Sequence, residues 1–358
     1  MLQQLIQPGV TLTPEIDSAL SVIAESASGS EQLGVPRTNI DLLASVGVHG
    51  TALDVAQQRE VTERLAGADA STWFCWTQHQ TPLLTMLAGG NQRASAELSE
   101  RWLTGLQNGE FLAAIAFAHV RRGGPPNPVA KKVTNGWELS GKLDWITSWD
   151  IADVLMLLAM TEDKTQIVIF YLPIKGFEDT FAHCAVGEPL RLLAMSGTHS
   201  RPITFDHTFI GNDFVFSIID SQEWLSADSE KTVLPNPAAL GVSRAAIEQL
   251  NEVSHARKQE VGQVAARDLA EEFVRLRAQA YGAIDNPQTP RSELVDLRVR
   301  VLEFAVKCAV AVITAVSGGA MITGGEAERR LREAMFLQVQ AQTQETRDAA
   351  LARLSSTD

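Results

Sequence analysis

Residues 135–148, NGWELSGKLDWITS, carry the clearest secondary-structure signal in the chain. Asn135-Gly136 is typical of a tight β-hairpin turn, and a strand-like run follows it. Four more short β-rich runs separated by turn residues lie in the same part of the chain, at 112–117, 152–160, 166–172 and 202–205. The segment 112–225 therefore predicts a small antiparallel β-barrel or sandwich.

The sequence on both sides of this segment has helical periodicity. Before it, Thr13 and Asn39 are expected to cap helices, because short polar side chains satisfy the free N–H groups of a first helical turn. Three further helices are expected at 54–65, 71–87 and 94–106. After it, the pattern predicts three long helices, 238–281, 292–316 and 326–354, packed as an antiparallel bundle.

These patterns predict a multidomain α+β fold in three parts. An N-terminal helical domain spans 1–111, a middle antiparallel β domain spans 112–225, and a C-terminal bundle of the four-helix type spans 226–358. The long C-terminal helices are apolar on more than one side, as at Leu269, Phe273 and 309–316. A helix apolar over such a wide arc needs several packing partners, so we expect a homodimer or homotetramer.

Composition narrows the class of protein. The 358 residues are 45% hydrophobic and 20% charged, which is an ordinary globular balance, and the net charge of −13 disfavours nucleic acid or an anionic membrane as a partner. Three cysteines without metal-binding spacing indicate a reduced cytoplasmic protein with no metal site. The N-terminal residues do not show the basic region followed by an apolar region that is typical of a signal peptide, so none is expected. The most apolar run, 308–322, is too short to span a bilayer.

Three motifs, in order, resemble those of the acyl-CoA dehydrogenase superfamily. Residues 135–148 with Ala152-Asp153 are similar to the family's "NGxxxxGxKxWITN…AD" run, 193–206 to its "GxRxSxT…FxDVxVP" strand pair, and 239–248 to the opening of its long helices. The resemblance covers nearly the whole chain. It implies the family's fold and a flavin cofactor.

The resemblance places the flavin contact at Trp145, Ile146 and Thr147. Strand alternation sends Trp145 and Thr147 to one face, where an indole and a hydroxyl supply the flat wall and the hydrogen-bond donor that an isoalloxazine ring needs. The alternative is a tryptophan packed in the barrel core. The same resemblance implies contacts from Ser148 and from Ala118, in the segment 116–126 that replaces the family's "TEPGAGSD" loop.

Two more positions resemble contacts with the diphosphate and adenosine parts of FAD. Arg257 lies where the family has an arginine that meets the cofactor of a neighbouring subunit, and Gly318 and Gly319 resemble its "QxxGG" stretch. The glutamine position of that stretch is Ala315, which leaves FMN as an alternative to FAD. An exposed basic turn is the other interpretation of Arg257.

The chemistry departs from the family pattern. Arg332-Glu333-Ala334 matches the family's "RDA", and the catalytic glutamate of the following "YEGT" then falls on Ala341. Alanine cannot act as a general base. Some family members place this base near the start of the first long helix, where Glu230 is the candidate; a solvated glutamate is the alternative.

Residues 69–79 resemble instead the "ADxSxxWxxxxH" helix of the flavin-dependent monooxygenases that share the fold. These relatives take reduced FMN from a partner reductase, and His79 is then the candidate acid–base group, against a histidine buried in the core.

Three hypotheses stay open. One is an oxidoreductase acting on a small-molecule or acyl-thioester substrate, with a flavin reductase or an electron-transfer flavoprotein as partner. The second is the monooxygenase, and the third is a non-catalytic binding or assembly scaffold.

Overall fold

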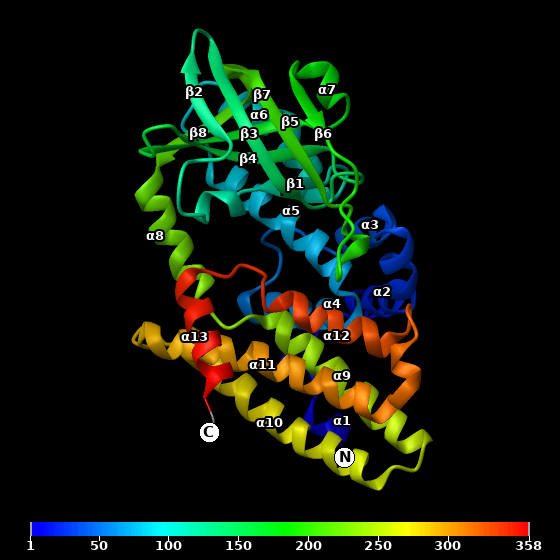
Figure 1. The fold of residues 1–358 in the computed structure, drawn as a ribbon. Helices are drawn as coiled ribbons and strands as arrows, with labels where there is room; N and C mark the ends of the chain where they lie inside the picture. Colours follow the sequence, from blue (N-terminus) through cyan, green and yellow to red (C-terminus); the bar gives the residue numbers. More distant parts are fainter. Residues whose placement is uncertain (1, 357–358) are drawn as a thin grey trace.

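The computed structural model describes residues 2–356, and its N-terminal part is helical (Figure 1). Its helices are α1 (Leu2–Leu5), α2 (Pro14–Leu33), α3 (Arg37–Ser45), α4 (Val55–Ala68), α5 (Ala70–Ala88) and α6 (Ser95–Asn108). Thr13 caps α2 as predicted, and Asp54 caps α4 in a reciprocal capping box with Gln57.

The prediction that Asn39 caps a helix is wrong. Helix α3 begins two residues earlier, after Pro36, and Asn39 lies inside it. The Asn39 side chain is buried, and its amide donates to the Thr72 hydroxyl at 3.0 Å and to the Ser26 hydroxyl at 3.2 Å. The tertiary contact with α2 and α5, rather than a helix end, accounts for the asparagine.

An eight-stranded sheet follows, between residues 113 and 220. Its strands are β1 (Ala113–Ala116), β2 (Val129–Val133), β3 (Gly136–Ile146), β4 (Val154–Thr161), β5 (Gln166–Pro173), β6 (Cys184–Val186), β7 (Arg201–Gly211) and β8 (Val215–Asp220). The order is β6-β7-β3-β2-β4-β5-β8, with β1 on β4. The β2–β3 hairpin turns at Asn135, which has φ +62°. The pairing is antiparallel as predicted except that β1 and β2 run parallel to β4.

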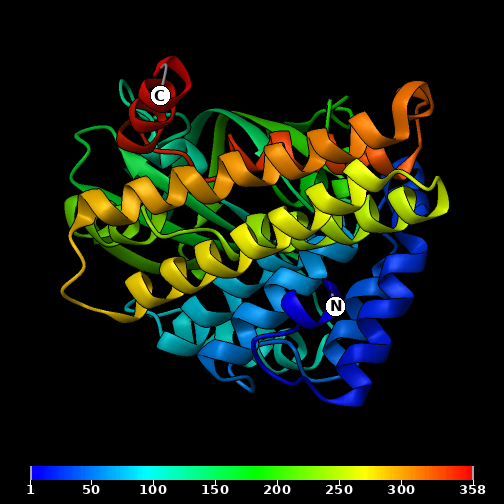
Figure 2. The same cartoon turned by 90° about the horizontal axis from the view of Figure 1, so that it is seen from below.

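The C-terminal part is again helical, but two of the predicted long helices are wrong. Its helices are α8 (Ser221–Thr232), α9 (Pro237–Ala256), α10 (Glu260–Asp285), α11 (Arg291–Val316), α12 (Glu326–Leu337) and α13 (Gln344–Ser355). The predicted helix 238–281 breaks at 257–259, and 326–354 breaks at 338–343. The first break lets α10 fold back along α9, and the second places α13 against α11. Figure 2 shows the long helices α9, α10 and α11 side by side.

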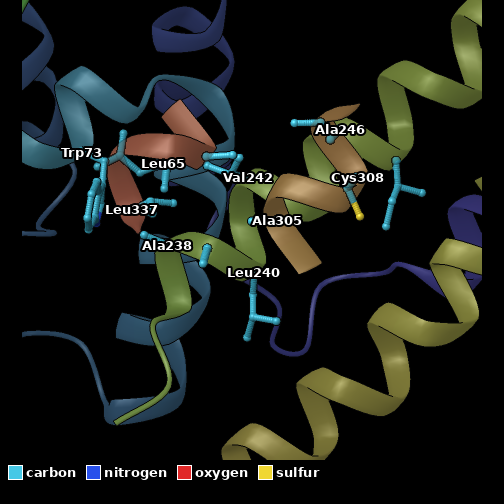
Figure 3. Close-up of a cluster of buried hydrophobic side chains, with 14 of the residues drawn as sticks. Leu65, Trp73, Ala238, Leu240, Val242, Ala246, Ala305, Cys308 and Leu337 are labelled. Atoms are coloured by element: carbon cyan, nitrogen blue, oxygen red, sulfur yellow. The ribbon is translucent and has the colours of Figure 1, made fainter. Parts of the chain in front are cut away.

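The N-terminal helices and the C-terminal bundle share one hydrophobic core. Figure 3 shows Leu65 of α4 and Trp73 of α5 beside Val242 of α9, Ala305 of α11 and Leu337 of α12. Helices α4 and α9 approach so closely that a Cβ on Gly241 would lie 1.8 Å from the Glu63 carbonyl oxygen. Only glycine fits at that crossing. Separate clusters fill the interior of the sheet and the space between it and α5 and α6.

A buried charge network lies at the same crossing. Glu60 and Glu63 of α4 have no exposed surface, and Arg244 of α9 and Arg277 of α10 each bond to both carboxylates. The Tyr281 hydroxyl also donates to Glu63. Because an unpaired buried charge is very costly, these contacts fix the two helical parts relative to each other.

Substitution of Arg244 by methionine should destabilise the fold strongly. It leaves Glu60 and Glu63 in the core with half of their cationic partners, so we expect a loss of about 3–5 kcal/mol in the free energy of unfolding. Urea denaturation at fixed protein concentration measures it. The control is Arg353→Met, which removes an exposed arginine paired with Glu303 and Asp296 and should cost under about 1 kcal/mol. Equal losses of unfolding free energy in the two variants would contradict the stabilising role given to the buried charge network.

Candidate functional site

A cavity of about 600 Å³ lies between the sheet and the C-terminal helices. One wall is apolar and comes from β1, β4 and β5, through Ile115, Met156, Leu158 and Ile169. The facing walls come from α5, α8, the start of α9 and the turn after α12. The volume is in the range of small-molecule sites, and an apolar wall opposite polar groups is typical of them.

Helix α5 contributes three hydroxyls to this cavity. Thr77, Thr81 and Thr85 are four residues apart, so they lie on one face of the helix, and all three line the cavity. We did not identify these threonines from the sequence. Their spacing on a mostly apolar helix was the available signal.

Ala341 also lines the cavity. It lies in the turn between α12 and α13 and has φ +52°. The motif match that placed the family's glutamate on Ala341 therefore leads to the wall of this cavity. Among the described residues that line it, the one carboxylate is Asp228, which accepts two bonds from Arg121, at 2.6 and 2.7 Å.

In the segment 145–148, Trp145 is exposed and the three residues after it are buried, so Trp145 and Thr147 do not share the exposed face that strand alternation predicts. Trp145, near the end of β3, is 52% exposed, whereas Ile146 and Ser148 are fully buried. The Thr147 hydroxyl lies 3.2 Å from that of Ser200, and Thr147 is 6% exposed. The indole is thus not packed in the barrel core. An open aromatic face beside a hydroxyl suits a flat aromatic cofactor.

Ala118 lies in a short helix that an ion pair links to β3. It is exposed in the short helix η1 (Ala118–Arg121), and Arg122 just after η1 donates to Asp144 of β3 at 2.6 Å. This ion pair links the end of η1 to β3, the strand that carries Trp145 next to its last residue. Phe117, which precedes η1, lines the cavity, and Arg122, which follows η1, is paired with the residue before Trp145.

Arg257, Gly318 and Gly319 come together at another place in the bundle. Arg257 lies in the turn between α9 and α10 and donates to the carbonyls of Ala315 and Val316, both at 2.9 Å. It thereby caps the C-terminal end of α11, and the glycines follow in η4 (Ser317–Met321). None of the three lines the cavity.

The two candidate acid–base groups lie elsewhere. Glu230 of α8 is 70% exposed and bonds to Arg291 at 2.8 Å. His79 of α5 has no exposed surface; its Nε2–H donates to the Leu106 carbonyl at 3.0 Å, and its Nδ1 accepts from the Ala113 N–H at 3.1 Å. Neither side chain lines the cavity.

Burial lowers the pKa of His79 to about 3, with a smaller contribution from His49, whose ring centroid is 4.6 Å away. Both ring nitrogens of His79 are bonded to backbone groups and the ring is neutral at physiological pH. Its contacts join the end of α6 to the start of β1, which is a structural task.

The comparisons with known proteins agree with this architecture. No family model matches the chain. It is similar to the mitochondrial isovaleryl-CoA dehydrogenase of Pongo abelii, with 22% identity over 340 residues, 89% of this chain and 78% of that protein. The solved butyryl-CoA dehydrogenase of Megasphaera elsdenii has a TM-score of 0.76 and 18% identity over 97% of this chain and 100% of that one.

A third similar protein is a glutaryl-CoA dehydrogenase of Mycobacterium smegmatis, solved in complex with FADH2. Its TM-score is 0.76 with 14% identity, and the match covers 96% of this chain and 95% of that one. The chain thus has the acyl-CoA dehydrogenase fold. The resemblance to the acyl-CoA dehydrogenase superfamily, and the multidomain α+β fold class, are confirmed.

Within residues 2–356, no cluster of His, Cys, Asp and Glu has a geometry that could hold a metal ion. Within the same limits, no helix combines the length and the apolar character needed to cross a bilayer. Cys75, Cys184 and Cys308 are free thiols.

The pH dependence of stability tests the structural role of His79. Below about pH 6.5 the unfolded chain protonates this ring and the folded chain does not. The free energy of unfolding therefore decreases by about 1.4 kcal/mol for each unit by which the pH is lowered, as the contribution of this residue. His79→Gln should therefore flatten the curve by that slope between about pH 5.5 and 4.5. Urea unfolding at several pH values measures it. Parallel curves for the two proteins would show that the folded ring takes a proton, and would return His79 to the acid–base candidates.

Proposed function

We propose that the chain is a flavin-dependent oxidoreductase whose substrate occupies the cavity beneath the sheet. The observation that carries the proposal is the 52% exposed indole of Trp145, which follows the Asp144 that pairs with Arg122 and lies two residues before Thr147. The solved glutaryl-CoA dehydrogenase with FADH2, which shares the fold, supports the same cofactor class.

In this proposal Trp145 stacks on the flavin and the Thr147 hydroxyl donates a hydrogen bond to it. Arg257 with Gly318 and Gly319 is proposed to meet the diphosphate and adenosine parts of a cofactor held by a neighbouring subunit. FAD is the first candidate, and FMN stays the alternative because Ala315 replaces the family's glutamine. A bound flavin supplies the acceptor for a hydride or electrons.

A homodimer or homotetramer would complete the proposed cofactor contact at Arg257, Gly318 and Gly319. Large apolar side chains near it are exposed in the single chain: Val261 by 84%, Met321 by 70% and Ile322 by 68%. Burial of such surface against another copy is favourable. A flavin reductase or an electron-transfer flavoprotein is the proposed redox partner.

The residues around the cavity argue against ordinary acyl-CoA dehydrogenation. That reaction needs a carboxylate to remove the α-proton of the acyl group. Ala341 offers no such group. The carboxylate of Asp228 already accepts hydrogen bonds from two nitrogens of Arg121. The monooxygenase that uses reduced FMN is the second candidate function, and it is favoured because the described residues of the cavity wall include no carboxylate free of an ion pair.

Trp145→Ala should weaken flavin binding substantially, because loss of a stacked aromatic costs about 1 kcal/mol or more beyond area burial. Equilibrium dialysis with FAD and with FMN, oxidised and reduced, measures the affinity. Phe209→Ala is the matched control, since Phe209 is also 52% exposed and lies near the other end of the β3–β7 pair.

Thr147→Val should perturb flavin binding or reduction without unfolding the protein. If the wild-type protein binds neither flavin in either redox state, the scaffold hypothesis replaces the proposed function. An equal loss of binding in the Phe209 variant would remove Trp145 from the site.

Saturated straight- or branched-chain acyl-CoAs should bleach the flavin slowly or not at all. Loss of a general base costs about 10²–10⁴-fold in rate. Anaerobic stopped-flow absorbance measures bleaching, and chemical reduction by dithionite serves as the control that the flavin is competent. Glu230→Gln should leave the slow rate unchanged. Fast bleaching that Glu230→Gln abolishes would make Glu230 the base, and fast bleaching that survives it would contradict the placement of Ala341.

A further inference from the structure

The cavity is positively charged although the protein is strongly acidic. Four cationic side chains line it, Arg59, Arg121, Lys231 and Arg298, against the single carboxylate of Asp228. The formal charge of the lining is thus +3 in a chain whose net charge is −13. A cavity lined by one sign of charge concentrates ligands of the other sign.

Ion pairs within the described chain account for two of the four cations. Arg121 bonds to Asp228 through two nitrogens, and Arg59 bonds in the same manner to Asp285, at 2.6 and 2.9 Å. Lys231 is exposed on α8. Arg298 differs from all of these, because it is deeply buried and has no carboxylate partner among residues 2–356.

Arg298 lies on α11 and is 3% exposed. Its Nη1 donates to the Leu234 carbonyl at 2.8 Å and its Nη2 to the Gln340 carbonyl at 3.0 Å, while its Nε has no partner. A guanidinium has five N–H donors, so most of its donor capacity is unused. Burial and the nearby charge of Arg121 lower the pKa of Arg298 to about 10, and the group is still a cation at neutral pH.

The two carbonyl bonds give Arg298 a structural task but do not neutralise it. They join the loop before α9 to the turn that carries Ala341. Carbonyl dipoles offset only part of the desolvation cost of burying a charge. A buried ion without an oppositely charged partner keeps the rest of that cost. A carboxylate on a bound molecule would supply the missing partner in the bidentate geometry that arginine favours.

We propose that the cavity binds a substrate with a carboxylate group, and that Arg298 holds this carboxylate. The apolar wall of Ile115, Met156, Leu158 and Ile169 then contacts the hydrocarbon part of the molecule. The bound molecule is a free organic acid or the acyl thioester of a dicarboxylic acid. That it is the substrate of a redox reaction rests on the proposed function, whereas carboxylate binding itself does not require flavin.

Hexanoate and its uncharged counterpart hexanamide test the inference. Trp73 and Trp224 line the cavity, so their fluorescence reports occupancy. The wild-type protein should bind hexanoate about 10–100-fold more tightly than hexanamide, as expected for a charge-assisted bond. Arg298→Met should remove this preference, and Arg298→Lys should restore part of it. Arg300→Met, two residues along α11 and outside the cavity, should leave it intact.

Adipyl-CoA and hexanoyl-CoA separate the two sources of the carboxylate. An Arg298-dependent preference for adipyl-CoA indicates a dicarboxylic thioester, and hexanoate binding without that preference indicates a free acid. Equal binding of hexanoate and hexanamide by the wild-type protein overturns the inference, whether or not the Arg298 variants fold. Equal loss of both ligands in Arg298→Met also overturns it, because the arginine then acts only on the loops. Flavin affinity measured on the same proteins shows separately whether the proposed function fails.

Discussion

Two buried carboxylates on α4 must be neutralised by the C-terminal bundle, and the rest of the architecture depends on this requirement. Glu60 and Glu63 are each bonded to Arg244 and to Arg277. These two carboxylates therefore join α4 to α9 and α10 of the C-terminal bundle. The bonds are reachable because Gly241 lets α9 lie directly against the backbone of α4. Helix α9 begins at Pro237, on the cavity wall, and α5 and α6 pack on the face of the sheet that supplies the apolar wall of the cavity. The cavity is therefore positioned by interactions that lie outside it.

Local sequence signals predicted what local physics controls. The Asn135-Gly136 hairpin and the Thr13 cap are correct because turn and cap geometry depend on a few neighbouring residues. The break at 257–259 has neither glycine nor proline, and Lys258 takes φ +55° there. An unbroken helix 238–281 would be about 66 Å long, and its second half could not pack back along α9 as α10 does. The gain from folding α10 back, which buries Leu269 and Phe273, outweighs the local cost, and only tertiary packing reveals it.

The site divides in the same way. Motif spacing led to Ala341 and to the segment at Trp145, because the order of elements along the chain carries that information. His79 was ambiguous from sequence, since the groups that bond it are main-chain atoms of Leu106 and Ala113 and no side-chain pattern encodes them. Arg298 was missed altogether. It stands between Leu297 and Val299, both buried, and a charged residue within an apolar stripe was the signal for it.

The proposed loss of the base at residue 341 and the unpaired charge of Arg298 explain each other. Arg298 bonds to the carbonyl of Gln340, so residue 341 is one peptide unit from the guanidinium, and both residues line one cavity. A glutamate at 341 would lie near this cation, and an adjacent positive charge lowers the pKa of a carboxyl group. A carboxylate stabilised in this manner is a weak base for proton abstraction. The same guanidinium that would disable a base on the protein is free, with alanine at 341, to hold a carboxylate on the substrate.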